Sequence, residues 1–254
     1  MIICENVNKL FSNSSGIFDV NVTFMPGVVN GIIGFNGAGK TTLLRCIEGL
    51  YYPTSGDIFH DNINTKDDTN FGKVKKTISF LPADDFLYDN LTCLENIELT
   101  TILRTGSNKI SKQTHDLLKY FEAAGFLSKK FGECSTGMKK KIQLISTLIG
   151  EVDTIIWDEP NDSLDIVSNI KLKNLIGYYK EMKKTIIITS HVAEFLDDFI
   201  DYFILLKNGK IVEENKRENI GSFKDVLLNH LDSQSLEVPF YDRSLSPAKN
   251  KEPE

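Results

Sequence analysis

Residues 34–42 read Gly34-Phe35-Asn36-Gly37-Ala38-Gly39-Lys40-Thr41-Thr42 and fit the phosphate-loop pattern G-x-x-x-x-G-K-[S/T]. An apolar run of strand length, residues 28–33, precedes this stretch, and residues 41–47 read as the opening of a helix. Small residues at such a junction let backbone N–H groups turn around an anion, and the helix dipole adds a favourable field. The alternative is a glycine-rich turn without a ligand, but the strand and the helix favour a site for a nucleoside triphosphate.

All nine residues of the loop are therefore candidate nucleotide-binding residues. Lys40 would bring a positive charge to the β- and γ-phosphates, and Thr41 would offer an oxygen to Mg²⁺.

The composition agrees with a soluble globular protein, because 41% of the 254 residues are hydrophobic and 25% are charged. The net charge of −6 argues against nucleic acid as a partner, since phosphate backbones usually require a basic face.

The order of the apolar segments predicts an α/β fold. Residues 1–30 alternate apolar and polar positions between turns, which is typical of a small antiparallel β region. Residues 154–157 and 185–189 are continuous apolar runs around a helical stretch at 165–183, as in a parallel sheet buried on both faces. Between about 84 and 150 the apolar residues recur at helical spacing. We expect a P-loop core with a mainly parallel sheet, an antiparallel subdomain and a helical insertion.

A second candidate part of the site is Asp158-Glu159, which ends the apolar strand 154–157. A carboxylate at the carboxyl end of a parallel strand can bind Mg²⁺ beside a phosphate loop, and a second carboxylate can polarise an attacking water. An acidic turn without function is the alternative. Because the pair follows a phosphate loop within an α/β pattern, we interpret Asp158 as a metal-binding residue and Glu159 as a general base.

From residue 1 to about 222 the chain resembles the ATP-binding subunit of an ABC transporter. The resemblance implies that Asp158 is the Walker B aspartate and that Glu159 is the catalytic glutamate. Five further residues match family motifs: Ser135 and Gly137 in the signature, Asp165 in the D-loop, His191 as the switch histidine, and Phe11 as the aromatic that stacks on adenine. It also implies ATP and Mg²⁺ as cofactors.

Two motifs depart from the family pattern. The signature is usually Leu-Ser-Gly-Gly-Gln, whereas residues 134–138 read Cys-Ser-Thr-Gly-Met. The lysines at 139–141 that follow oppose the helix dipole, and they either attract a triphosphate or form a solvated basic face. At the Q-loop position, where the family has glutamine or glutamate, the chain has Ala83, which cannot ligate a metal. A one-residue shift would let Asp84 or Asp85 substitute, and this alternative stays open.

The resemblance implies a head-to-tail dimer of two ATP-binding subunits, with each ATP between one phosphate loop and the other subunit's signature. We expect transmembrane permease subunits to be separate polypeptides, since no apolar run reaches the roughly 18 residues of a membrane span. The ATPase would then lie in the cytoplasm, on the membrane face, and export is favoured over import. Four scattered cysteines are consistent with reduced cytosolic thiols.

The expected domains are an ATPase domain over residues 1–222 and a C-terminal extension over residues 223–254, part of which is not expected to pack. Two alternative functions remain open from the sequence. One is a soluble ABC-type regulator or translation factor, although such factors usually carry two ATPase modules in one chain. The other is an assembly ATPase that acts on a soluble partner.

Overall fold

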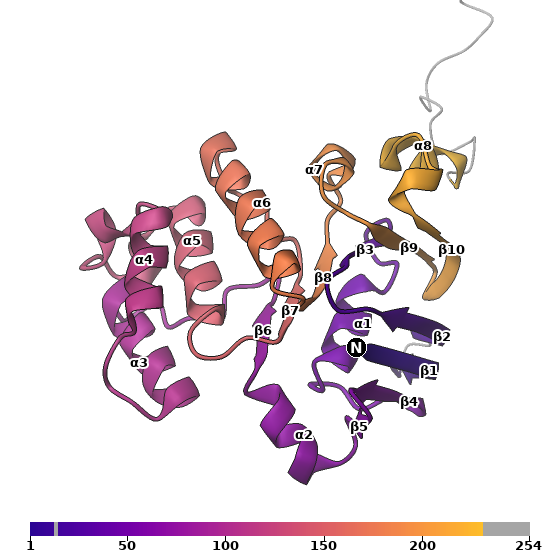
Figure 1. Ribbon diagram of the computed structural model, residues 1–254, viewed down its shortest axis with the longest axis horizontal. Coiled ribbons are helices and arrows are strands. Elements are labelled where there is room, and N and C mark those ends of the chain that lie inside the picture. Colours follow the sequence, from indigo (N-terminus) through magenta and orange to yellow (C-terminus); the bar gives the residue numbers. More distant parts are fainter. Residues whose placement is uncertain (13–14, 231–254) are drawn as a thin grey trace, which may run out of the picture.

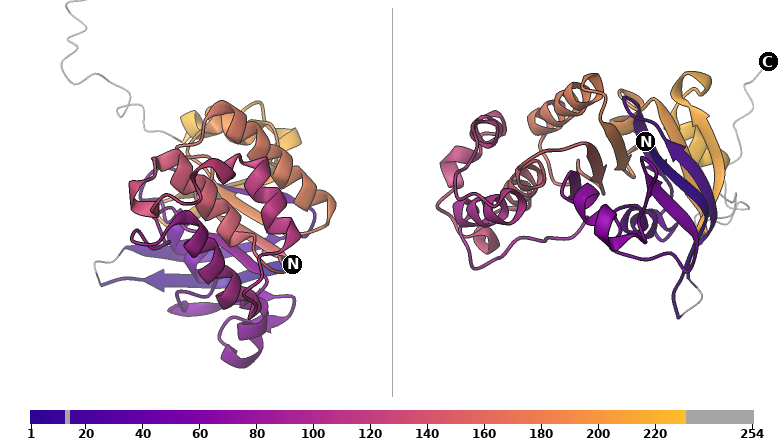
Figure 2. Two further views of the ribbon diagram at one scale, coloured as in Figure 1. Left: turned by 90° about the vertical axis from the view of Figure 1, so that its left-hand side faces the viewer. Right: turned by 60° about the horizontal axis from the view of Figure 1, so that its bottom comes forward.

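The computed structural model describes residues 1–12 and 15–230. Figures 1 and 2 show an antiparallel sheet at one side, a central sheet with helices against it, and a group of helices at the other side. Within the described residues, no helix is both long enough and apolar enough to cross a membrane. This is the predicted α/β architecture.

The central sheet has six strands in the order β10-β9-β3-β8-β7-β6. Its strands are β3 (Val29–Ile33), β6 (Ile78–Leu81), β7 (Thr154–Trp157), β8 (Thr185–Thr189), β9 (Tyr202–Lys207) and β10 (Lys210–Lys216). Strands β6, β7, β8, β3 and β9 run parallel, whereas β10 pairs antiparallel with β9. Every residue of β3, β7 and β8 is buried, which explains the unbroken apolar runs in their sequences. The predicted parallel sheet is confirmed.

The second sheet is antiparallel, with the order β2-β1-β4-β5. It consists of β1 (Ile2–Leu10), β2 (Gly16–Phe24), β4 (Ser55–His60) and β5 (Ile63–Asn64). Helix α1 (Lys40–Ile47) packs against both sheets, because Leu43 and Ile47 share one buried cluster with Ile58 of β4 and Ile187 of β8. The helix that begins at the phosphate loop is thus fixed from two sides.

The helical group contains α3 (Cys93–Thr105), α4 (Lys112–Tyr120), α5 (Thr136–Thr147) and short 3₁₀ turns at Ala123–Phe126 and Phe131–Glu133. A capping box of Thr92 and Glu95 starts α3, and Gly106, with φ at 70°, ends it. Ile145 of α5 lies in the same buried cluster as Ile155 of β7, so the group packs directly on the central sheet. Its status as a separate subdomain stays a prediction.

The remaining helices are α2 (Asp68–Lys75), α6 (Ile166–Glu181), α7 (Ala193–Asp197) and α8 (Phe223–Asn229), with a 3₁₀ turn at Arg217–Asn219. Helix α8 falls in the predicted C-terminal extension, but Phe223 and Val226 are buried. The Phe223 ring meets Phe203 of β9 edge to face, with centroids 5.2 Å apart. The packed chain therefore continues past residue 222. The domain boundary stays a prediction, and residues 231–254 lie outside the described residues.

All four cysteines are free and buried, in keeping with the predicted reduced thiols. Cys134, the first residue of the signature, belongs to the core cluster, and its Sγ lies 3.5 Å from Sγ of Cys93 at the start of α3. Burial raises the pKa of the Cys93 thiol to about 12, with the hydrogen bond to Cys134 acting in the same direction. Cys134 is thus a packing residue.

Candidate functional site

The phosphate loop connects the end of β3 to the start of α1, as its sequence predicts. Gly37 and Gly39 have φ values of 78° and 105°, which side chains rarely adopt. A Cβ on Gly39 would also lie 2.8 Å from Cγ2 of Ile17 on β2. Glycine is therefore required where the loop enters α1, both for its backbone conformation and for the close approach of β2.

Lys40 is the first residue of α1, and its side chain lies along the loop. Its Nζ donates to the carbonyl oxygens of Gly34 at 2.7 Å and Phe35 at 3.4 Å, and the residue is only 8% exposed. The loop carbonyls thus position the ammonium group beside the bend in the chain. This arrangement supplies a fixed positive charge next to the inward-turned loop, where an anion would be attracted.

Asp158, at the carboxyl end of β7, joins that strand to helix α1 and to strand β8. One carboxylate oxygen accepts a hydrogen bond of 2.5 Å from the Thr41 hydroxyl on α1, and the other accepts one of 2.5 Å from the Thr189 hydroxyl at the end of β8. The carboxylate is 1% exposed, so these bonds replace lost hydration. The sequence motifs do not single out Thr189 as a site residue. Its place as the last residue of the apolar strand 185–189 is the signal that could have indicated it.

Glu159 follows Asp158 in the left-handed region, with φ at 50°. Its N–H donates to the Thr189 hydroxyl at 2.9 Å. One oxygen of its carboxylate, Oε2, accepts from the backbone N–H of His191 at 3.0 Å and lies 2.9 Å from Nδ1 of the same histidine. The structure therefore brings the two predicted catalytic residues together, with the carboxylate largely covered and the imidazole exposed.

These residues surround a hollow of about 350 Å³. It is lined by Phe11, Ser15, Gly16, Asn36, Gly37, Ala38, Gly39, Lys40, Thr41, Thr42, Ala83, Asp158 and Glu159. Backbone N–H groups of the loop, one ammonium and two carboxylates thus meet in one place. Such a set can bind a polyphosphate, a metal ion and a water molecule side by side.

Phe11 lies at the rim of this hollow, 37% exposed, with its ring edge to face with Tyr51 at 5.7 Å between centroids. Adenine stacking by Phe11 is a prediction that follows from the family resemblance.

We expect Phe11→Ala to weaken ATP binding by on the order of tenfold, because a base–aromatic stack contributes about 1–3 kcal/mol. Phe11→Trp is the matched control that keeps a ring. Equal ATP affinity of the alanine variant and the parent, measured by calorimetry, would remove Phe11 from this role.

The signature and D-loop residues lie elsewhere. Ser135 caps α5, since its hydroxyl accepts from the N–H of Met138 at 3.3 Å. Asp165 caps α6 in the same way, accepting from the N–H of Ser168 at 2.7 Å. Ser135, Gly137 and Asp165 are not among the residues that line the hollow. A single copy of the chain therefore does not bring its signature to its own phosphate loop.

The Q-loop segment contributes one residue to the hollow. Ala83 lines the hollow, but Asp84 and Asp85 do not. Asp84 lies 3.6 Å from the guanidinium of Arg45, and Asp85 accepts from Nζ of Lys139 and from the amide of Gln143, both at 2.8 Å. In this structure side chains of α1 and α5 bind both carboxylates, and the substitution of an aspartate for the glutamine stays a prediction.

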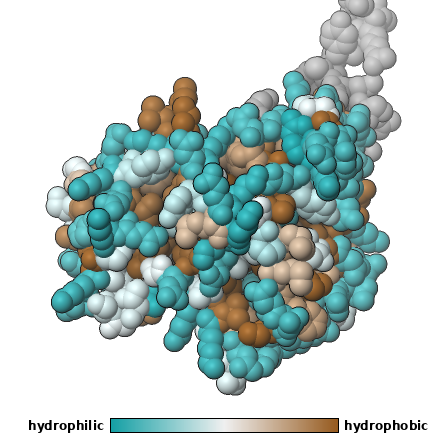
Figure 3. All heavy atoms as spheres, in the orientation of Figure 1, coloured by the Kyte–Doolittle hydropathy of each residue, from teal (hydrophilic) through white to brown (hydrophobic). Residues whose placement is uncertain are grey.

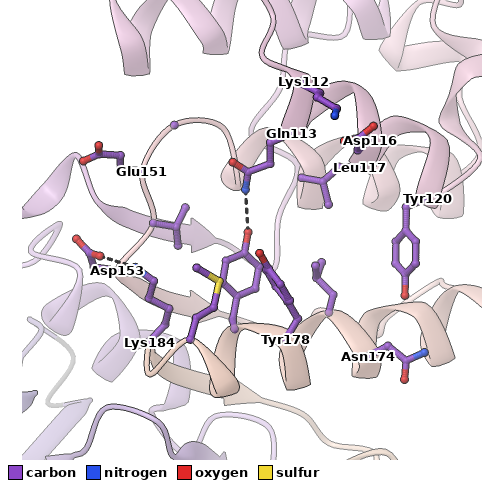
Figure 4. A pocket seen from close by; sticks show the side chains of 15 residues that line it. Lys112, Gln113, Asp116, Leu117, Tyr120, Glu151, Asp153, Asn174, Tyr178 and Lys184 are labelled. Atoms are coloured by element: carbon purple, nitrogen blue, oxygen red, sulfur yellow. Dashed lines mark hydrogen bonds and ion pairs between the residues drawn. The ribbon is translucent and has the colours of Figure 1, made fainter.

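A larger hollow, about 910 Å³, lies between α4 and α6. The side-chain amide of Gln113 donates to the hydroxyl of Tyr179 at 3.4 Å. Figure 4 shows Gln113, Tyr178 and Lys184 among the side chains that line this hollow. None of the predicted site residues lines it. Its tyrosines, methionine and mixed charges include no arrangement for phosphate chemistry, so the smaller hollow is the candidate site.

Comparison with known proteins agrees with this choice. The family model described as ABC transporter matches residues 17–162. The chain is 33% identical over 226 residues to the ABC transporter ATP-binding protein NatA of Bacillus subtilis, covering 87% of this chain and 91% of that protein.

The chain belongs to the ABC transporter family. Another relative, the SkfA peptide export ATP-binding protein SkfE of Bacillus subtilis, is 28% identical over 83% of this chain and 87% of its own length. Among solved structures, a dimeric ATP-binding cassette in a post-hydrolysis state, bound to ADP and Pi, is similar with a TM-score of 0.77. It is 28% identical, with 85% of this chain and 99% of the other covered. As an ABC cassette, the chain is an ATPase with a P-loop fold.

Proposed function

We propose that this ATPase powers transport across a membrane through separate transmembrane subunits, in the direction of export. The observation that supports the ATPase mechanism is the hollow in which Lys40, Asp158 and Glu159 meet beside the glycine-rich loop. Export is supported by the relative SkfE, whose name describes peptide export. In this proposal the chain acts at the cytoplasmic face of the membrane, bound to its permease partners.

Mg²⁺ is proposed to bind between Thr41 and Asp158. The two side chains fit this ion, because both offer hard oxygen ligands and both line the hollow. Their oxygens are already 2.5 Å apart, joined by a hydrogen bond. When bound, Mg²⁺ would supply positive charge to the β- and γ-phosphates.

The chain's own residues then have distinct proposed roles. The nine residues of the phosphate loop bind the phosphates, with Lys40 contributing the charge. Glu159 polarises the attacking water as a general base. His191, which already shares a hydrogen bond with Glu159, contacts the γ-phosphate and orients that carboxylate.

A second copy of the chain is proposed to complete the site in a head-to-tail dimer. Ser135 and Gly137 of that copy would cover the γ-phosphate, and Asp165 would lie at the same junction. An exposed hydrophobic surface supports an interface near the D-loop: Ile166, Val167 and Ile170 on α6 are 81%, 58% and 55% exposed. Figure 3 shows strongly hydrophobic side chains projecting over one end of α6. Such a surface is typical of a site of protein association.

The transport proposal can be tested by expressing tagged Glu159→Gln in the native cell, solubilising the membranes and purifying the chain in Mg-ATP. Slow hydrolysis should keep the assembled state intact. We expect mass spectrometry to find a stoichiometric membrane protein with several spans, absent from a parallel preparation of Lys40→Ala. A soluble partner alone would contradict transport and leave the ATPase activity in place.

A further inference from the structure

Lys140 is a buried charge that the proposed function leaves unused. It lies in the second turn of α5, between two lysines whose ammonium groups reach acids near the surface. Lys139 binds Asp85 at 2.8 Å, and Lys141 lies 3.4 Å from a carboxylate oxygen of Asp165. Lys140 itself is only 6% exposed. The three consecutive lysines are therefore not a solvated basic face, and the middle one points into the protein.

The ammonium of Lys140 contacts the main chain of the candidate active site without lining the hollow. Its one hydrogen bond to the described part of the chain goes to the main-chain carbonyl oxygen of Glu159, at 3.4 Å. Burial lowers the pKa of Lys140, and the nearby carboxylates, Asp162 first among them, act against this shift. A buried lysine is unfavourable for folding unless its charge is compensated, so its presence beside the catalytic segment calls for a functional explanation.

The backbone at Glu159 makes this contact consequential. With φ at 50°, Glu159 lies in the left-handed region of backbone conformation, which residues other than glycine rarely adopt. This backbone conformation sets the direction in which its side chain leaves the chain. The N–H is bound to Thr189 at 2.9 Å, and the carboxylate is bound to His191. The remaining polar group of the residue, the carbonyl oxygen, accepts from the N–H of Asp162 at 3.3 Å and from Nζ of Lys140 at 3.4 Å. Lys140 is thus the contact by which α5 helps to fix the position of the residue that carries the carboxylate.

The same helix contacts the segment after Glu159 at a second point. A Cβ on Gly137 would lie 2.8 Å from the carbonyl oxygen of Ser163, so the first turn of α5 touches the D-loop directly. Asp85, two residues after Ala83, is bound by Gln143 of α5 at 2.8 Å. Ala83 itself presents only a methyl group to the hollow. A hydrogen bond that links α5 to the site must therefore be made by a residue other than Ala83.

We propose that Lys140 is a positioning residue for ATP hydrolysis: by binding the carbonyl oxygen of Glu159, it couples the orientation of the catalytic carboxylate to the helix that begins with the signature. The inference rests on the proposed role of Glu159. It means that hydrolysis at one phosphate loop responds to the position of the same chain's signature helix, which covers the nucleotide of the other copy.

The test replaces Lys140 by Met, whose volume is similar and which has no charge. We expect kcat of Lys140→Met to fall by about tenfold or more, since small displacements of a catalytic group are costly, while the Kd for ATP stays the same. The midpoint of thermal unfolding should stay the same or rise, because the buried ammonium is gone. Lys119→Met, at an exposed position on α4 outside the hollow, is the matched control and should keep the parent kcat. Lys140→Arg should restore most of the activity.

A double-variant comparison separates positioning from a general structural effect. If Lys140 acts through the carboxylate, Lys140→Met should leave the residual single-turnover rate of Glu159→Gln unchanged within about twofold. An equal loss in the parent and the Glu159→Gln background would overturn the inference, as would a parent-like kcat for Lys140→Met. Full turnover by Glu159→Gln alone would instead refute the proposed role of Glu159, which distinguishes the two failures.

Discussion

Glu159→Gln should still bind ATP, while its rate of ATP hydrolysis falls about 100-fold or more, the scale expected for the loss of a general base. The amide keeps the size of the side chain and an oxygen that can accept the hydrogen bond from the His191 N–H, which the carboxylate now accepts at 3.0 Å. It lacks the charge that polarises water. The structure around the site should therefore stay intact, and the loss should appear in kcat.

Phosphate release and calorimetric ATP binding measure the two quantities separately. Glu181→Gln, which removes an exposed carboxylate at the end of α6, is the matched control and should hydrolyse ATP at the parent rate. Turnover by Glu159→Gln at a rate near that of the parent would show that another group polarises the water.

Lys40→Ala should weaken ATP binding itself, with a Kd about 10- to 100-fold higher. Hydrogen bonds between a charged donor and its partner contribute about 1.5–3 kcal/mol, and every 1.4 kcal/mol is a factor of ten. The ammonium already points along the loop, bonded to Gly34 at 2.7 Å, so little reorganisation is needed to bind phosphate.

Lys119→Ala removes an exposed positive charge from α4, outside the hollow, and serves as the control for net charge. Circular dichroism verifies that both variants fold. Unchanged ATP affinity in Lys40→Ala would contradict the assignment of residues 34–42 as the phosphate loop.

The parts of the fold and site that the sequence predicts are those that depend on local pattern. Residues 28–33 form a buried strand because they are apolar throughout, and the glycines of the loop adopt the backbone angles for which glycine is needed. Asp158 and Glu159 reach the loop because parallel strands carry their carboxyl ends to one edge of the sheet. Local chemistry and a general rule of sheet topology are sufficient for these.

The parts that the sequence did not predict depend on contacts between distant segments. The bond from Thr189 to Asp158 requires the register of β7 against β8, which no short pattern contains. Consecutive residues on a helix point about 100° apart, so only one of three adjacent lysines can face inward. Which one does so depends on how α5 packs, and that decides the different surroundings of Lys139 and Lys140.

The most direct test of the composite site is the mass of Glu159→Gln in solution with Mg-ATP, measured by light scattering. We expect the 28.6 kDa chain to double its mass with ATP and to remain a monomer without it. Ser135→Asp in the same background keeps a capping oxygen for α5 but places a negative charge where the partner's γ-phosphate would lie. That double variant should bind ATP and stay a monomer. An ATP-saturated Glu159→Gln that never dimerises, or a Ser135→Asp variant that dimerises equally well, would contradict a site completed by the second copy's signature.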